Sequence, residues 1–185
     1  MNDVAALETR ISAALGRIET GLGQMADAGS GDGAGAAVFE PSEDGAGVLS
    51  VDLGADGGKG GTMVIRSMGS AGEPQATNDP ENFRLHFEGR AVFKIAVQGI
   101  SASAARVLER AGLTADDVDL VVPHQANARI IDSATRRLGI EAGRVFVNIT
   151  DLGNTAAASI PMALSDALDA GRISPGDTVV LTAFG

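Results

Sequence analysis

The chain has 185 residues and a formal net charge of −10, which disfavours binding of the whole chain to nucleic acid or to an anionic membrane surface. It contains no cysteine, which excludes disulfides and thiolate metal sites and fits a cytoplasmic location. Aromatic residues make up only 3%, so the core has to be built from aliphatic side chains. No apolar run approaches the roughly 18 residues of a membrane span, and no signal-peptide pattern opens the chain.

Residues 2–27 form the first predicted element, an amphipathic helix that makes residues 1–28 a unit of their own. An apolar residue recurs every seven positions: Val4, Ile11, Ile18 and Met25. Three to four heptads are close to the minimum for a coiled coil, and three glycines weaken the helix. Two interpretations stay open, a dimerising coiled coil or a helix whose stripe lies on the rest of the protein.

The next predicted region, residues 31–90, is rich in glycine and irregular. Gly31, Gly33 and Ala36 match the GxGxxA pattern of a dinucleotide-binding loop, with Asp52 about 20 residues later. That fingerprint needs a strand before it and a helix after it, whereas here the β-like run Ala36–Phe39 follows. We therefore reject a dinucleotide site.

Two further elements are expected before residue 90. Val48–Leu53 is predicted to be a short strand. Met68–Pro80 lacks periodicity and is predicted to be a surface loop. His86 has no motif around it and is predicted to be a packing or surface residue.

Residues 91–185 alternate regularly between helical and strand patterns, and glycines follow the helices at stop positions. Such an order with short loops predicts an α/β fold with a mostly parallel sheet. The expected elements are helix Val92–Ala111, strand Val118–Val122, helix Ala126–Leu138, strand Val145–Ile149, helix Ala156–Ala170 and strand Thr178–Phe184.

Two of these strands are followed by polar side chains, His124 after the first and Asn154 after the second. If the strands are neighbours, both side chains lie at the same edge of the sheet. A neutral imidazole N–H and a carboxamide N–H can then donate to one oxygen and form an oxyanion hole. The alternative is structural: His124 caps a helix and Asn154 shapes a turn.

The motifs around these two residues carry a family resemblance. Pro123–Ile130 reads PHQANARI and Gly153–Pro161 reads GNTAAASIP. Together they resemble the C-terminal half of 3-oxoacyl-acyl-carrier-protein synthase III (beta-ketoacyl-ACP synthase III) of the thiolase superfamily. Gly31–Glu40 and the helix around Phe93 are similar to further family segments, in which small residues let a core strand pass close to the active site and Phe93 is a packing residue. The resemblance covers about residues 31–185 and implies half of a thiolase-like fold. Residues 1–28 have no counterpart in it.

The resemblance also implies a chemistry: condensation of acetyl-CoA with malonyl-acyl carrier protein in fatty-acid initiation, with release of CO2 and CoA. It implies that His124 and Asn154 bind the malonyl thioester carbonyl and stabilise the enolate formed as CO2 leaves, without metal or other cofactor. It further implies a segment that binds acyl carrier protein, made of Gln125, Ala126, Asn127, Ala128 and Arg129. Gln125 and Asn127 are expected to order the loop and the start of the helix by local hydrogen bonds.

The docking role of Arg129 follows from the motif match, whereas charge alone favours a solvated helix face and leaves Arg136 and Arg137 undecided. Residues 123–144 contain four arginines against Asp132 and Glu141, a local charge of +2 in an acidic chain. Such a spot can steer an acidic partner, although a solvated helix face explains the same pattern.

The departures from the family pattern define the remaining expectation. The family uses a cysteine nucleophile from its N-terminal half, and this chain has no cysteine. Leu152 stands where the family has an aromatic residue, and the sequence stops at Phe184-Gly185, before a Gly-rich turn of the family. We therefore expect a truncated or split synthase that is inactive in condensation by itself and that pairs with a Cys-bearing half or with a second copy. The alternative is a non-catalytic pseudo-enzyme that dimerises and binds acyl carrier protein.

Overall fold

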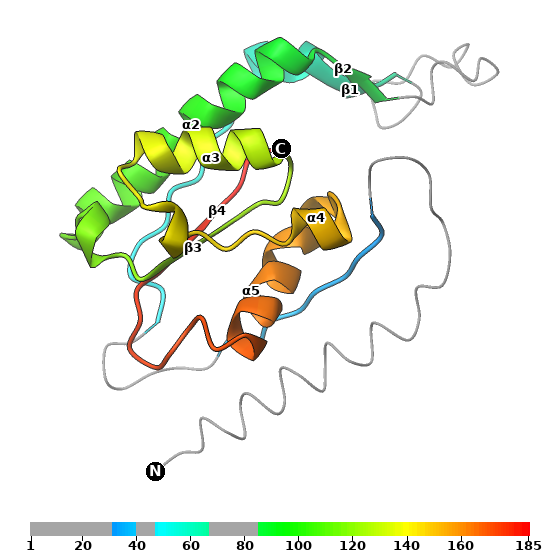
Figure 1. Cartoon of the computed structure of the whole chain (residues 1–185). Coiled ribbons are helices and arrows are strands. Elements are labelled where there is room, and N and C mark those ends of the chain that lie inside the picture. The colour runs from blue at the N-terminus through cyan, green and yellow to red at the C-terminus, as the bar shows by residue number, and fades with distance from the viewer. Residues whose placement is uncertain (1–30, 40–46, 67–84) are drawn as a thin grey trace.

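The computed structural model describes residues 31–39, 47–66 and 85–185 (Figure 1). The helix expected over residues 2–27 and the loop expected over Met68–Pro80 lie outside the described residues. The bounds of the helices and strands are α2 Gly89–Ala111, α3 Ala128–Arg137, α4 Ile149–Leu152 and α5 Ser159–Asp169, with strands β1 Met63–Ile65, β2 Leu85–Phe87, β3 Leu120–Pro123 and β4 Val179–Thr182.

The central sheet is parallel, as the sequence predicted. β3 pairs with β4 in a register that runs from Leu120 opposite Val179 to Pro123 opposite Thr182. On the other side of β3, Val145 forms an isolated parallel bridge with Val121. The strand predicted over Val145–Ile149 is thus reduced to this bridge, because the backbone turns into the short helix α4 at Ile149. A separate antiparallel pair joins β1 and β2.

Helices cover both faces of this sheet and make three layers. On one face, Val121 and Val180 pack against Ala104 and Leu108 of α2. On the other face, Leu120 and Val122 pack against alanines of α5, Ala163 and Ala167. Alternate residues of β3 therefore point into two different cores, which explains why the whole strand is buried and apolar. The α/β prediction is confirmed.

Helix α2 lies beside α3 (Figure 1). Its hydropathy corrects the expectation that no segment of the chain approaches a membrane span. An 18-residue window of it has a mean hydropathy of 1.3, so by length and composition it qualifies as a membrane span. Its apolar stripe is buried in the protein itself, with Ala96 and Ile100 packed on Ile130 and Ala134 of α3. This packing places one stripe of α2 in the core, and 33% of the apolar window is buried. Phe93, expected to pack, is instead 38% exposed.

The two N-terminal stretches predicted as strands, Ala36–Phe39 and Val48–Leu53, are extended but do not form strands. A strand exists only when a neighbouring backbone completes its hydrogen bonds, and no described segment pairs with either stretch. The prediction was wrong for that reason. Their large apolar side chains are exposed: Val38, Phe39, Val48, Leu49, Val51 and Leu53.

Candidate active site

His124 follows β3 directly and is fixed from three directions. Its backbone N–H donates to the Thr182 carbonyl at 2.8 Å, which extends the pairing with β4 by one residue. The Phe184 ring packs edge-on against the imidazole, with ring centroids 5.6 Å apart. The ring nitrogen Nδ1 lies 2.5 Å from the Ser159 hydroxyl at the start of α5. Two separate segments, the end of β4 with the residues after it and the start of α5, therefore hold His124 and its ring in place.

The protonation state of His124 follows from its surroundings. Partial burial lowers the pKa of the imidazole below its ordinary value, since the charged form loses hydration. His124 is therefore neutral at pH 7, and a neutral imidazole carries one N–H that can donate to an oxyanion.

Gln125, the next residue, is 1% exposed and uses its whole carboxamide. Nε2 donates to the carbonyls of Pro123 at 2.8 Å and Phe146 at 3.2 Å. Oε1 accepts the N–H groups of Asn148 at 3.1 Å and Ile149 at 3.2 Å. The side chain joins the end of β3 to the neighbouring chain where regular strand pairing stops. Gln125 thus orders this region as expected, but mostly through residues 21 to 24 positions away rather than through local hydrogen bonds. No surface remains on Gln125 for a partner, so its side chain stays out of the proposed carrier contact.

Asn154 lies in a tight turn between α4 and α5. Its Oδ1 accepts the N–H of Ala156 at 2.9 Å, and its carbonyl accepts the N–H of Gly31 at 3.1 Å. Ala156 has a φ of 49°, a left-handed conformation that is uncommon for a residue with a Cβ. Strain of this kind gathers at functional sites.

The Gly-rich segment reaches the site through close contact with this turn. A Cβ on Gly33 would lie 2.5 Å from the Met162 sulfur, and one on Gly35 would lie 2.5 Å from the Pro161 ring. A Cβ on Gly31 would overlap the Leu152 carbonyl. The expectation that small residues allow close passage beside the site is confirmed, although the passing chain is not a strand.

The described geometry brings the two predicted motifs together. His124 and Asn154 were expected to converge if the segments before them were neighbours in the sheet. They are neighbours: Val121 bridges Val145, and the N–H of Phe146 donates to the Val121 carbonyl. Ser159, five residues after Asn154, contacts the His124 ring directly. A common oxygen position between His124 and Asn154 stays a prediction. Sequence reasoning missed Ser159 and Phe184, although Ser159 belongs to the quoted GNTAAASIP motif.

The predicted docking helix α3 has a clear exposed face. Asn127 caps it, with Oδ1 accepting the Arg129 N–H at 2.9 Å, as expected. Ala128 and Arg129 are exposed, while Ala126 is half-buried. Arg136 is paired with Asp132 on the same helix. Arg144 donates to backbone carbonyls, those of Ala115 at 3.0 Å and Val118 at 2.9 Å.

The predicted basic spot is therefore smaller than its composition suggests. Two of the four arginines, Arg136 and Arg144, are engaged within the protein. Arg129 and Arg137 remain as exposed cations on α3.

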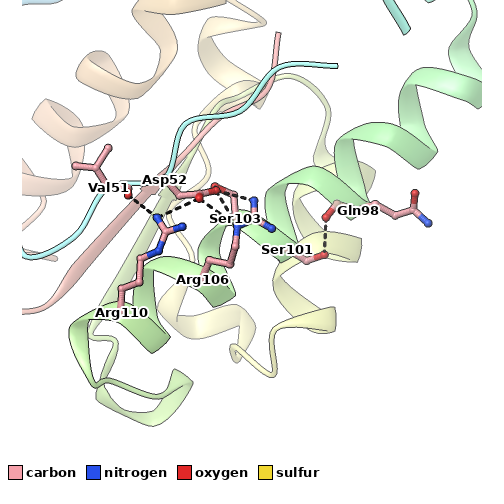
Figure 2. Close-up of polar contacts among 7 residues, drawn as sticks. All are labelled: Val51, Asp52, Gln98, Ser101, Ser103, Arg106 and Arg110. Carbon is pink, nitrogen blue, oxygen red and sulfur yellow. Dashed lines mark hydrogen bonds and ion pairs between the residues drawn. The ribbon is translucent and has the colours of Figure 1, made fainter. Parts of the chain in front are cut away.

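A second polar cluster ties the N-terminal stretch to α2 (Figure 2). The Asp52 carboxylate accepts from Ser103 at 2.8 Å and from Arg106 at 2.6 Å, and Arg110 donates to the Val51 carbonyl at 2.9 Å. Hydrogen bonds from Arg106 and then Ser103 hold the pKa of Asp52 well below its ordinary value. A hollow of about 610 Å³ opens beside this cluster and reaches Phe184 but includes neither His124 nor Asn154. Within residues 31–39, 47–66 and 85–185, no group of three acidic or histidine side chains is placed to hold a metal.

Comparison with known proteins agrees with this arrangement. Residues 108–185 match the family described as 3-oxoacyl-[acyl-carrier-protein (ACP)] synthase III C terminal. A beta-ketoacyl-[acyl-carrier-protein] synthase III of Desulfitobacterium hafniense is 46% identical over 156 residues, or 84% of this chain. The chain is therefore similar to the C-terminal half of the 3-oxoacyl-[acyl-carrier-protein] synthase III family.

Solved structures place it within the family fold. The synthase III of Thermus thermophilus aligns with a TM-score of 0.68 at 45% identity, covering 77% of this chain and 44% of that one. The enzyme of Aquifex aeolicus aligns with a TM-score of 0.67 at 36% identity, covering 78% of this chain and 42% of that one. The described residues therefore form the C-terminal half of a thiolase-like fold. The chain spans about half the length of the curated relatives it matches, 47% for the Desulfitobacterium protein.

Proposed function

We propose that His124 and Asn154 form the oxyanion hole for the decarboxylation step of a beta-ketoacyl-ACP synthase III. The observation that carries the proposal is the His124 imidazole, neutral and fixed by Ser159 beside the turn that holds Asn154. Asn154 turns its Oδ1 toward the Ala156 N–H, which leaves the amide Nδ2–H2 group free to donate. Two neutral donors suit an oxygen on which negative charge develops.

The proposed step balances without an added oxidant or metal. In a malonyl thioester, the bond between the α-carbon and the carboxylate carbon breaks and CO2 leaves. The electron pair of that bond forms an enolate, whose negative charge rests on the thioester oxygen. Donation from His124 and Asn154 to that oxygen lowers the energy of the enolate before it attacks an acyl group. The proposed reaction uses no cofactor beyond its substrates.

Acyl transfer through a thioester intermediate requires a cysteine nucleophile, and none of these 185 residues is cysteine. We infer that the active assembly includes a Cys-bearing half that covers the exposed apolar side chains near residues 38–39 and 48–53. Joined in this way, the region serves fatty-acid initiation in the cytoplasm. By itself it should form no acyl-enzyme adduct with acetyl-CoA, and a thiol-reversible mass shift of one acetyl group would contradict this.

The proposed carrier contact is centred on Arg129. It lies on the exposed side of the first turn of α3, five residues after His124, and offers a cation to an acidic carrier protein. Exposed charge pairs contribute about 1 kcal/mol or less each and weaken with salt. Arg129→Glu should weaken carrier binding at low salt and flatten its salt dependence, whereas Arg136→Glu removes an arginine already paired within its helix. Equal carrier affinity of wild type and Arg129→Glu at low salt would contradict the docking role.

The decisive experiment measures CO2 release from malonyl-carrier by the chain mixed with a separately expressed Cys-bearing half. His124→Ala and Asn154→Ala should each lower the rate by about 10²- to 10³-fold, the usual effect of removing one oxyanion donor. Ser165→Ala, a half-buried serine on the same helix as Ser159, is the matched control and should leave the rate unchanged.

Stability has to be measured beside activity, because His124 and Asn154 also make structural contacts. If both variants lose free energy of unfolding in proportion to their loss of activity, His124 and Asn154 act structurally, as a helix cap and a turn residue. If the mixture binds carrier without releasing CO2, the non-catalytic pseudo-enzyme is the better description.

A further inference from the structure

Ser159 is the residue whose surroundings the proposed reaction leaves unexplained. It is the first residue of α5 and only 2% exposed. Its hydroxyl oxygen lies 2.5 Å from His124 Nδ1 and also accepts the backbone N–H of Gln125 at 3.2 Å. A buried hydroxyl with two nitrogen neighbours has to distribute one proton and two lone pairs between them.

The proton between Ser159 and His124 can be placed in two ways. In the first, the hydroxyl accepts from Gln125 and donates its proton to Nδ1, so the imidazole proton sits on Nε2. In the second, Nδ1–H donates to the hydroxyl, which then accepts two N–H groups and has to donate its own proton elsewhere. Among the described residues Ser159 Oγ has no third partner within hydrogen-bond distance. The second arrangement leaves a buried O–H unsatisfied, which costs about 1–3 kcal/mol.

We propose that Ser159 is a positioning residue that fixes His124 as the Nε2–H tautomer and so aims its single N–H away from α5, toward the substrate oxygen. The inference deepens the proposed role of His124, because an oxyanion hole needs a hydrogen on the nitrogen that faces the substrate. With the opposite tautomer, Nε2 would present a lone pair to the developing negative charge.

The other ring contacts agree with this assignment. Phe184 meets the ring edge-on at an interplanar angle of 60° and offers no polar atom to either nitrogen. The backbone N–H and carbonyl of His124 are occupied by Thr182 and Ala126, so neither competes for Nδ1. Within the described residues Ser159 alone makes a hydrogen bond to the ring.

The test is a long-range proton–nitrogen NMR spectrum of the full chain with ¹⁵N-labelled histidine, recorded well above the pKa of histidine. The chain has two histidines, so His86→Gln assigns the signals. We expect a pyrrole-like Nε2 and a pyridine-like Nδ1 for His124. A pyrrole-like Nδ1, or nitrogen shifts averaged as in free histidine, would overturn the proposal.

Variants then test whether Ser159 is the cause. Ser159→Ala should shift His124 toward a mixture of tautomers, Ser159→Thr should restore the Nε2–H form because it keeps the hydroxyl, and Ser165→Ala should change nothing. An unchanged tautomer in a folded Ser159→Ala variant would also overturn the proposal. If that variant does not fold, the wild-type spectrum still tests whether His124 is the Nε2–H tautomer.

The spectrum needs no substrate, carrier or second polypeptide, so it fails or succeeds separately from the proposed function. In the reconstituted mixture, Ser159→Ala should slow CO2 release by about tenfold, less than His124→Ala, because part of the population still holds the correct tautomer. If wild-type His124 is the Nε2–H tautomer but the mixture releases no CO2, the role of Ser159 is supported and the proposed function is contradicted.

Discussion

Two regions of the molecule are held in different ways. Residues 85–185 contain three clusters of buried side chains, packed on both faces of β3 and β4 and between α2 and α3. Residues 31–39 and 47–66 contain no buried residue and keep their place through glycine contacts with the Asn154 turn and a carboxylate held by α2. Apolar composition alone therefore does not make a core. The same kinds of side chain are buried where a second layer meets them and exposed where none does.

The largest expected difference between the regions concerns leucine truncation. Leu120 on β3 is 1% exposed and Leu53 is 91% exposed. Leu120→Ala should lower the free energy of unfolding of the isolated chain by about 2–5 kcal/mol, through lost burial and a cavity. Leu53→Ala should change it by about 0.5 kcal/mol or less. Urea unfolding of both variants makes the comparison, and similar losses would mean that Leu53 belongs to a core after all.

Gln125 extends the comparison to polar groups inside the packed region. Gln125→Ala leaves the carbonyls of Pro123 and Phe146 and the N–H groups of Asn148 and Ile149 without their partner. We expect a loss of about 2 kcal/mol or more in the free energy of unfolding. Asn127→Ala, which removes an exposed helix cap two residues away, should cost only about 1 kcal/mol. Equal losses in chemical denaturation would show that water replaces the buried bonds of Gln125.

The attachment of residues 31–39 can be broken at one glycine. A Cβ on Gly35 would lie 2.5 Å from the rigid Pro161 ring, so Gly35→Ala should cost about 1–3 kcal/mol. Gly99 on α2 has open space around its Cβ position, and Gly99→Ala should stabilise the chain by up to about 1 kcal/mol. Thermal unfolding of the two variants should therefore shift in opposite directions. A neutral Gly35→Ala would mean that this segment does not fold together with α5.

The smallest effect is expected at Asp52, where the ion pairs are partly open to solvent. Arg106 and Ser103 lower the pKa of Asp52. At any pH above its ordinary pKa of about 4, the ionised carboxylate therefore holds residues 51–52 on α2. This contribution is lost as the pH falls below that value, since the unfolded segment then binds the proton more readily. Limited proteolysis of residues 47–66 should accelerate on acidification. Asp52→Asn should be cleaved faster than wild type at neutral pH, and its cleavage rate should not change with pH. A wild-type cleavage rate in this variant would show that Asp52 does not hold the segment on α2.

The α/β class, the helix stops and the two motifs of the site could be predicted from the amino-acid sequence. Helix periodicity and stop glycines are local, so α2, α3 and α5 end within two residues of Gly112, Gly139 and Gly171, which all have positive φ. Asn127 as a cap followed from local hydrogen-bonding chemistry in the same way, whereas the hydrogen bonds of Gln125 to Phe146, Asn148 and Ile149 depend on tertiary packing.

Which apolar segments become strands and which polar atoms meet depends on tertiary packing and could not be predicted from local patterns. Strand patterns at Ala36–Phe39 and Val48–Leu53 stay unpaired, because pairing depends on a neighbour that no local pattern specifies. The contact between His124 and Ser159 joins residues 35 positions apart, and that between Asp52 and Arg106 spans 54. Their meeting depends on how β3, α2 and α5 stack, which is a property of the packed layers rather than of either stretch of chain.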